Sequence, residues 1–291
     1  MTIALFGNTS KSATMIEVEH ILDYMRRNKV NVLLSQEIRQ ELNIRDLPAF
    51  PENWEGDHQP ENIYGEPIDF AVSVGGDGTF LTTAATIGDK NIPILGINCG
   101  HLGFLADVQT KDVDQILAKL LAGEYTIEQR SLLNVSCNRE GLIPSPNALN
   151  EIAIMKQGFS SMISVEVKVN AEILHTYHAD GLVLSTPTGS TAYNLSIGGP
   201  LLVPQSRGIV LSPIATHSLT IRPLVVPDDW KFDLKVSSRY GNYMISVDGR
   251  SLILSDEVKL HIEKAKYTVK LVQIGENSFL KSLRDKLNWG R

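Results

Sequence analysis

The stretch IDFAVSVGGDGTFLTT, residues 68–83, decides the fold of the first part of this chain. An apolar run of strand length ends at Val74, and three glycines surrounding Asp77 follow directly. The next residues, FLTTAATIG, are compatible with a helix. A strand, a glycine turn and a helix in this order predict one unit of a parallel α/β sheet, with the turn at the carboxyl end of its strand.

The surrounding sequence repeats this alternation. Short apolar runs at 2–7, 30–35 and 92–98 predict strands, and residues 12–28 and 112–125 show helical spacing. In the first helix this spacing rests on Ile16, Ile21, Leu22 and Met25, and basic residues suit its C-terminus. Residues 47–67, rich in Pro, Gly and acids, predict a long surface loop. Residues 1–125 are therefore expected to form an α/β domain, a parallel sheet with crossover helices.

The pattern changes near Thr126. Short runs rich in β-branched residues follow one another, and VEVKVN (165–170) alternates strictly. This predicts a mostly antiparallel all-β C-terminal domain over residues 126–275. Residues 276–291 return to helical spacing, and we expect this C-terminal helix to pack back on the first domain.

Composition excludes several classes of protein. The net charge of −6 over 291 residues, without a basic stripe, argues against a nucleic-acid partner. We find no signal peptide and no apolar run long enough to span a membrane, which favours a cytoplasmic protein. Cys99 and Cys137 are far apart and are interpreted as free thiols. Neither a P-loop nor a standard dinucleotide fingerprint occurs.

The GGDG turn admits two interpretations. It is a tight turn that happens to contain an aspartate, or it is a backbone opened toward phosphates, because residues without Cβ atoms allow close approach. In the second case Asp77 would serve as a base for an attacking hydroxyl, or would bind Mg²⁺ through water.

Two further stretches carry polar side chains suited to a ligand. LSTPTGSTAYNLS (184–196) concentrates hydroxyls and amides around Gly189, although a loop bonded to its own backbone has the same composition. Asn150 and Glu151 begin a predicted strand, where they would bind ribose hydroxyls and an adenine edge, or form a turn. His175 and His178 would face opposite sides of an extended segment, which argues against a zinc pair.

These segments in this order resemble the NAD kinase family. The resemblance rests on GGDGT, NCGHLGFLAD (98–107), LNE (149–151) and DGLVLSTPTGSTAYNLSIGGP (180–200), and it spans roughly residues 68–250. The long Ser/Thr/Gly block is specific. GGDGT alone also occurs in diacylglycerol and sphingosine kinases, so a lipid or sugar kinase is one alternative and a non-catalytic NAD(P) sensor is another.

The resemblance implies phosphorylation of the 2′-hydroxyl of the adenosine ribose of NAD by ATP, with Mg²⁺ carried by ATP. It makes Asp77 the general base and Gly78 a neighbour of the pyrophosphate. It further implies a homo-oligomer, a dimer or tetramer. The other implied binding residues are Phe104, Asn150, Glu151, His178, Asp180, Thr191, Ala192, Tyr193, Ser196 and Arg250.

Within that set, the roles differ. Phe104 would line the adenosine side, and Asp180 would contact the nicotinamide riboside end across a subunit interface. His178 and Arg250 stand where some relatives have Arg and Gln, so we expect binding roles for them without a defined partner. The sequence leaves open ATP or polyphosphate as donor, NAD or NADH as acceptor, and feedback by NADP(H).

Overall fold

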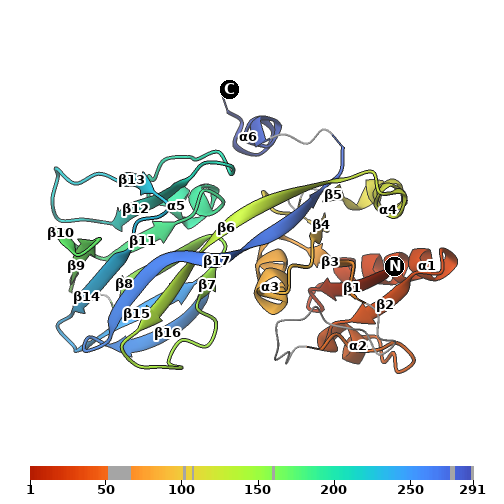
Figure 1. Cartoon of the computed structure of the whole chain (residues 1–291), viewed down its shortest axis with the longest axis horizontal. Helices are drawn as coiled ribbons and strands as arrows, with labels where there is room; N and C mark the ends of the chain where they lie inside the picture. The colour runs from red at the N-terminus through yellow and green to blue at the C-terminus, as the bar shows by residue number, and fades with distance from the viewer. Residues whose placement is uncertain (52–66, 101–102, 107, 159–160, 276–278, 290–291) are drawn as a thin grey trace. The chain divides into compact units, whose positions relative to one another are not determined.

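The computed structural model describes residues 1–51, 67–100, 103–106, 108–158, 161–275 and 279–289 (Figure 1). The chain divides into two compact units. Unit 1 comprises Met1–Gln129 and Val269–Arg291, and unit 2 comprises Arg130–Thr268. In the described part, no helix is both long and apolar enough to cross a membrane.

Unit 1 is built on a parallel sheet in the order β2-β1-β3-β4, as the sequence predicts. β5 and the end of β17 also pair with β4 in parallel. Four of its strands are almost entirely buried, because helices cover a parallel sheet on both faces. The strands are β1 (Thr2–Gly7), β2 (Asn31–Leu34), β3 (Phe70–Gly75), β4 (Ile94–Asn98) and β5 (Val108–Gln109).

The helices of unit 1 follow from their apolar spacing and their ends. α1 buries Val18, Ile21, Leu22 and Met25 and ends in two arginines, whereas Ile16, which also belongs to the predicted spacing, is 67% exposed. Gly123 ends α4 in the left-handed conformation that glycine favours. The helices are α1 (Ser12–Arg27), α2 (Gln36–Glu41), α3 (Asp77–Ile87), the 3₁₀ turn η1 (Thr110–Asp112), α4 (Val113–Ala122) and α6 (Phe279–Leu287).

The order of the strands creates a switch point in unit 1. From β1 the chain passes through α1 to β2 on one side, and from β3 it passes through α3 to β4 on the other. β1 and β3 lie next to each other, and Gly7 pairs with Val74. Ligands of open α/β sheets bind at the carboxyl ends of the strands where the direction of winding reverses. The GGDG turn lies at that position.

Unit 2 consists of two sheets with a common core. One is antiparallel, in the order β13-β12-β11-β8-β15-β16, and the other contains β10, β9, β14 and β17, with β6 beside β17 and β7 beside β6. Alternating residues such as Val165 and Val167 in β9 meet Ile152 and Ile154 of β8 in one apolar cluster. The mostly antiparallel β architecture expected from the sequence is therefore confirmed.

The elements of unit 2 are short, apart from β6 and β17, which continue into unit 1. They are β6 (Thr126–Cys137), β7 (Asn147–Ala148), β8 (Glu151–Lys156), β9 (Ile163–Val169), β10 (Glu172–Ala179), β11 (Gly181–Ser185), the 3₁₀ turn η2 (Gly189–Thr191), α5 (Tyr193–Ser196), β12 (Gly208–Ile214), β13 (Leu224–Pro227), β14 (Phe232–Ser237), β15 (Asn242–Val247), β16 (Arg250–Ser255) and β17 (Lys259–Gln273).

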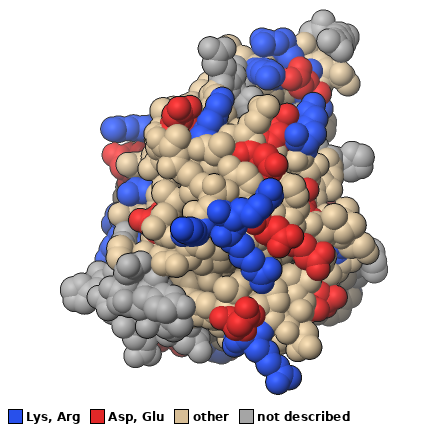
Figure 2. All heavy atoms as spheres, turned by 90° about the vertical axis from the view of Figure 1, so that its right-hand side faces the viewer, with Lys and Arg blue, Asp and Glu red and all other residues tan. Residues whose placement is uncertain are grey.

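The structure contains several short elements that the sequence pattern did not predict, and α2 is the one that borders the glycine turn's cavity. The short helix α2 begins after Ser35, whose side chain accepts a hydrogen bond from the backbone N–H of Ile38. Most of the expected loop 47–67 lies outside the described residues. On the face shown in Figure 2, Lys and Arg lie among Asp and Glu, so that face carries no continuous basic surface.

Candidate active site

The glycine turn of unit 1 opens the start of α3 to a ligand. A Cβ atom added at Gly76 or Gly78 would meet no described atom within 4 Å. At Gly75 a Cβ would lie 2.3 Å from Oγ1 of Thr79, so only glycine fits there. The first backbone N–H groups of a helix have no partner within the helix and attract anions. The geometry therefore suits a phosphate group beside Gly76 and Gly78.

The Asp77 carboxylate binds the backbone of a second glycine-containing segment. It accepts hydrogen bonds from the N–H groups of Phe104 at 2.8 Å, Leu105 at 3.0 Å and Ala106 at 3.1 Å. A Cβ at Gly103 would lie 1.9 Å from Oδ1 of Asp77. Asp77 therefore holds this segment in place, a role that the sequence did not suggest.

Phe104 lies within unit 1, where its ring contacts residues of α6. The Phe279 ring is 6.5 Å away between centroids, and the Lys286 ammonium lies 4.5 Å from the centre of the Phe104 ring. A cation over an aromatic face is attracted by the electrons of the ring. The C-terminal helix thereby covers a residue that the family resemblance assigns to the adenosine side.

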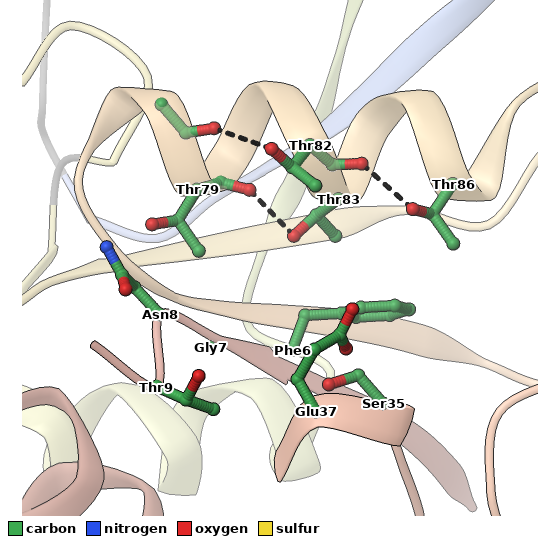
Figure 3. A pocket seen from close by; sticks show the side chains of 11 residues that line it. Phe6, Gly7, Asn8, Thr9, Ser35, Glu37, Thr79, Thr82, Thr83 and Thr86 are labelled. Atoms are coloured by element: carbon green, nitrogen blue, oxygen red, sulfur yellow. Dashed lines mark hydrogen bonds between the residues drawn. The ribbon is translucent and has the colours of Figure 1, made fainter. Parts of the chain in front are cut away.

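A cavity of about 350 Å³ opens beside the glycine turn (Figure 3). It lies at the switch point, between the face of α3 that carries threonines, the end of β1 and the start of α2. None of the residues named as site candidates from the sequence lines it, except Gly78. Its lining consists of Phe6, Gly7, Asn8, Thr9, Ser35, Glu37, Gly78, Thr79, Thr82, Thr83 and Thr86.

In unit 2, Asp248 holds Asn150 and Glu151 at the start of β8. Its carboxylate accepts hydrogen bonds from the N–H groups of Leu149 at 2.7 Å, Asn150 at 2.8 Å and Glu151 at 3.0 Å. Gly189 packs on the same segment, since a Cβ there would lie 2.1 Å from the carbonyl oxygen of Asn150. The sequence did not single out Asp248, and its position in the turn VDGR (247–250) was the available signal.

The Glu151 carboxyl is poised to titrate near neutrality. Burial, and to a lesser extent the charge of Asp248, raise its pKa to about 7, although a hydrogen bond from the Tyr193 backbone opposes the shift. Its Oε2 atom is buried and has no hydrogen-bond partner among the described residues. A protonated carboxyl can donate a hydrogen bond, so Glu151 can act as donor or acceptor toward a polar ligand.

The Ser/Thr-rich block divides into a structural and an accessible part. Ser185, Thr186, Ser190 and Asn194 are buried, and their side chains bond to nearby backbone or, for Asn194, to Ser212. For these residues the local-bonding interpretation is correct. The candidates Thr191, Ala192, Tyr193 and Ser196 lie on η2 and α5 or between them and remain partly or fully exposed.

The remaining candidates of unit 2 bond to neighbours other than the Ser/Thr block. Asp180 forms a 2.8 Å ion pair with Lys156, and the exposed His178 ring lies 2.9 Å from the Ser164 hydroxyl. Arg250 donates to the carbonyl of Asn147 at 2.9 Å. Among described residues, no group of three or more His, Cys, Asp or Glu is arranged to hold a metal ion.

Comparison with known families identifies the chain. The ATP-NAD kinase N-terminal domain matches residues 3–125, and the ATP-NAD kinase C-terminal domain matches residues 149–274. The chain belongs to the NAD kinase family. Both matches fall on the segments that carry the glycine turn and the Ser/Thr-rich block.

Full-length relatives support this membership. The NAD kinase of Bacteroides fragilis strain ATCC 25285 is 40% identical over 296 residues, covering 100% of this chain and 98% of its own. The NAD kinase of Flavobacterium johnsoniae is 39% identical with the same coverage. That of Porphyromonas gingivalis strain ATCC 33277 is 48% identical over 225 residues, which is 77% of each chain.

Solved structures show the same NAD kinase fold. An NAD kinase from Archaeoglobus fulgidus in complex with ATP has a TM-score of 0.73 and 26% identity, covering 99% of this chain and 98% of its own. Yeast NADH kinase complexed with NADH has a TM-score of 0.85 and 23% identity, covering 100% of this chain and 88% of its own.

Proposed function

We propose that this chain transfers the γ-phosphoryl group of ATP to the 2′-hydroxyl of the adenosine ribose of NAD, yielding NADP and ADP. The observation that carries the proposal is the open glycine turn with Asp77 at the switch point of unit 1, in a chain that aligns over its full length with NAD kinases. A phosphoryl group is transferred mainly by positioning and by neutralisation of charge.

The donor is assigned to unit 1. The N–H groups at the start of α3, beside Gly76 and Gly78, would hold phosphate oxygens. Mg²⁺ would arrive bound to ATP and shield the charge of the phosphates. The described residues hold no cluster of three or more metal-ligating side chains, so we assign the cation to the substrate and not to a resident site.

NAD is assigned to unit 2. Asn150 and Glu151, fixed by Asp248, would bind the adenosine, and Thr191, Ala192, Tyr193 and Ser196 would form the wall of its pocket. Asp180 would contact the nicotinamide riboside end, and Phe104 of unit 1 the adenosine side. His178 and Arg250 are retained as binding residues; the Arg250 Nε is buried without a described partner.

Asp77 is proposed as the general base. The ribose oxygen attacks the γ-phosphorus, its proton passes to the Asp77 carboxylate, and ADP leaves with the electrons of the broken P–O bond. Oδ1 already accepts two backbone hydrogen bonds and Oδ2 accepts one, which leaves Oδ2 the freer oxygen to take the proton. The same hydrogen bonds fix the orientation of the Asp77 carboxylate.

We further propose a cytoplasmic homo-oligomer, a dimer or tetramer. β10 is an edge strand of its sheet and exposes Ile173 (62%) and Leu174 (37%), a surface of the kind that pairs with another chain. Light scattering on the eluting protein should give a mass of at least twice 32.1 kDa. A monomer at micromolar concentration would exclude this assembly.

The decisive experiment is NADP formation by the purified protein with NAD and MgATP, measured with a coupled NADP-dependent dehydrogenase. Wild type should form NADP, and Asp77→Asn should not. Binding of NAD without turnover by wild type would favour the sensor alternative. Phosphorylation of a lipid or sugar in place of NAD would favour the other kinases that share the GGDGT turn.

A further inference from the structure

A second cavity, of about 560 Å³, lies on one face of the sheet in unit 2 that contains β9, β14 and β17 (Figure 1). Alternate residues of these strands, such as Val167, Leu234 and Leu260, are buried in the core of the unit. The residues between them point to the opposite face, because side chains alternate along a strand. The volume lies within the usual range for small-molecule sites. The charged lining residues are Glu166, Lys168, Asp233, Lys235 and Lys259, with His261 beside them.

One row of this face sets two lysines directly opposite each other. In the antiparallel register, Lys235 of β14 pairs with Lys259 of β17 on one side and with Glu166 of β9 on the other. Side chains at such positions have Cβ atoms about 4.5–5.5 Å apart, and like charges there destabilise a sheet. Within the described part of the chain, neither lysine forms an ion pair. Their mutual repulsion is therefore not offset by a described carboxylate.

In the next row the carboxylates are already bound. Lys168 of β9 pairs in register with Asp233, yet the Asp233 carboxylate lies 2.8 Å from the His261 ring. Glu263, two residues further along β17, forms a 2.8 Å ion pair with Lys231 and lies 3.7 Å from His261. Both carboxylates are thus engaged by other cations. The half-buried Lys168 has no ion-pair partner among the described residues.

The cavity consequently has a surplus of hydrogen-bond donors. Three ammonium groups, those of Lys168, Lys235 and Lys259, each bring three N–H donors and no acceptor. Only the Glu166 carboxylate is available to accept from them. The amide oxygen of Asn138 adds no free acceptor of comparable strength, because it accepts from the Lys259 backbone N–H at 3.0 Å. The missing partner is an anion with several acceptor oxygens.

A phosphate group supplies what this lining lacks. At neutral pH a phosphate monoester carries a charge of about −1.5 to −2 and three strongly accepting oxygens, so one group can bind several ammonium ions at once. A single carboxylate carries less charge and fewer oxygens. The exposed Ser136, also in the lining, offers a hydroxyl beside the lysines. The volume of about 560 Å³ leaves space for an organic group attached to the phosphate.

We propose that this cavity binds a phosphate group, either free orthophosphate or that of a small phosphorylated molecule, through Lys168, Lys235 and Lys259. Binding removes the repulsion between Lys235 and Lys259 and so stabilises the sheet. Affinity in the millimolar range is expected, because ion pairs at partly exposed positions are individually weak. The lining contains none of the residues assigned above to NAD or ATP, so the inference does not rest on the proposed function.

Thermal denaturation at constant pH and ionic strength tests the site. Replacing chloride by about 20 mM orthophosphate should raise the melting temperature of wild type roughly 3 °C more than that of Lys235→Gln/Lys259→Gln. Phosphate bound beside Gly76 and Gly78 would stabilise both proteins equally, so the difference reports this cavity alone. In chloride the double variant should melt no lower than wild type, because the repulsion between the lysines is gone.

Lys111→Gln/Lys266→Gln is the matched control. It makes the same change of charge at exposed positions outside the cavity and should respond to phosphate as wild type does. An equal phosphate response in all three proteins would overturn the inference. So would a Lys235→Gln/Lys259→Gln protein that melts below wild type in chloride, because the two lysines would then be stabilised by partners within the chain.

Calorimetric titration with orthophosphate and with glucose 6-phosphate distinguishes the two sources of the phosphate group. Tighter binding of glucose 6-phosphate, lost in Lys235→Gln/Lys259→Gln, identifies a phosphorylated molecule as the ligand. Equal or weaker binding of glucose 6-phosphate, with orthophosphate binding lost in the same variant, identifies free phosphate. Binding of both compounds that is unchanged in this variant would overturn the inference.

Discussion

The Asp77 carboxylate accepts a hydrogen bond from the backbone N–H of Phe104 at 2.8 Å. With the bonds from Leu105 and Ala106, it joins the first turn of α3 to a segment 27 to 29 residues later. A single aspartate thus stabilises the loops around the glycine turn and is also the proposed base. Substitutions can separate the two roles, because the structural role affects the folded state and the role as base affects only turnover.

Asp77→Asn should abolish most turnover. An amide cannot take a proton from the ribose, and loss of a general base typically costs about 10²–10⁴-fold in rate. The amide nitrogen also places N–H groups against a backbone N–H, so the free energy of unfolding should fall by about 1–3 kcal/mol. Steady-state kinetics and thermal denaturation measure the two effects. Retained NAD affinity is expected, and unchanged kcat would remove Asp77 from the chemistry.

Gly103→Ala tests the structural role alone. Its Cβ would lie 1.9 Å from Oδ1 of Asp77, so the segment 103–106 must shift and the three hydrogen bonds must weaken. We expect a lower melting temperature together with a lower kcat. Gly100→Ala is the control, since its Cβ would come no closer than 3.9 Å to a described atom. Equal stability of the two variants would show that the Asp77 hydrogen bonds contribute little.

Asp248→Asn should weaken NAD binding more than ATP binding. It removes the charge that holds the N–H groups of Leu149, Asn150 and Glu151, and a lost bond to a buried charged acceptor costs about 1–3 kcal/mol. The measured quantities are KM for each substrate and the melting temperature. Asp233→Asn, at an exposed pair with His261, serves as control. An equal rise of both KM values would place Asp248 outside the NAD site.

Glu151→Gln should change how stability depends on pH. The folded pKa of about 7 exceeds the ordinary value of 4.5, so between these values the folded state binds more protons than the unfolded state. The free energy of unfolding of the wild type therefore falls as pH rises through this window. Above pH 7 the destabilisation by ionised Glu151 is fully present.

The glutamine variant lacks this penalty. Its free energy of unfolding minus that of wild type should increase between about pH 5 and pH 8, by at most about 3 kcal/mol. Denaturant titrations at several pH values measure the difference, with the exposed Glu140→Gln as control. A pH-independent difference would mean that Glu151 is ionised throughout.

Local patterns in the sequence determined the architecture and the class of site. The apolar runs ending at Gly7 and Val74 and the helical spacing of residues 12–28 predicted the α/β unit, because hydrophobic periodicity and turn chemistry act over a few residues. The strict alternation in β9 predicted a half-buried strand of a sheet. The order of the GGDG, Asn150–Glu151 and Ser/Thr segments indicated the family.

Only the tertiary structure decided which side chains act together. Asp248 meets the N–H of Asn150 across 98 residues, and Glu37 shares a cavity with Thr82 because β2 and β3 lie on either side of β1. The division of the Ser/Thr block into buried and exposed hydroxyls likewise depends on how it packs against Leu149 and Asn150. Such contacts arise from strand order and long-range packing, which no local pattern encodes.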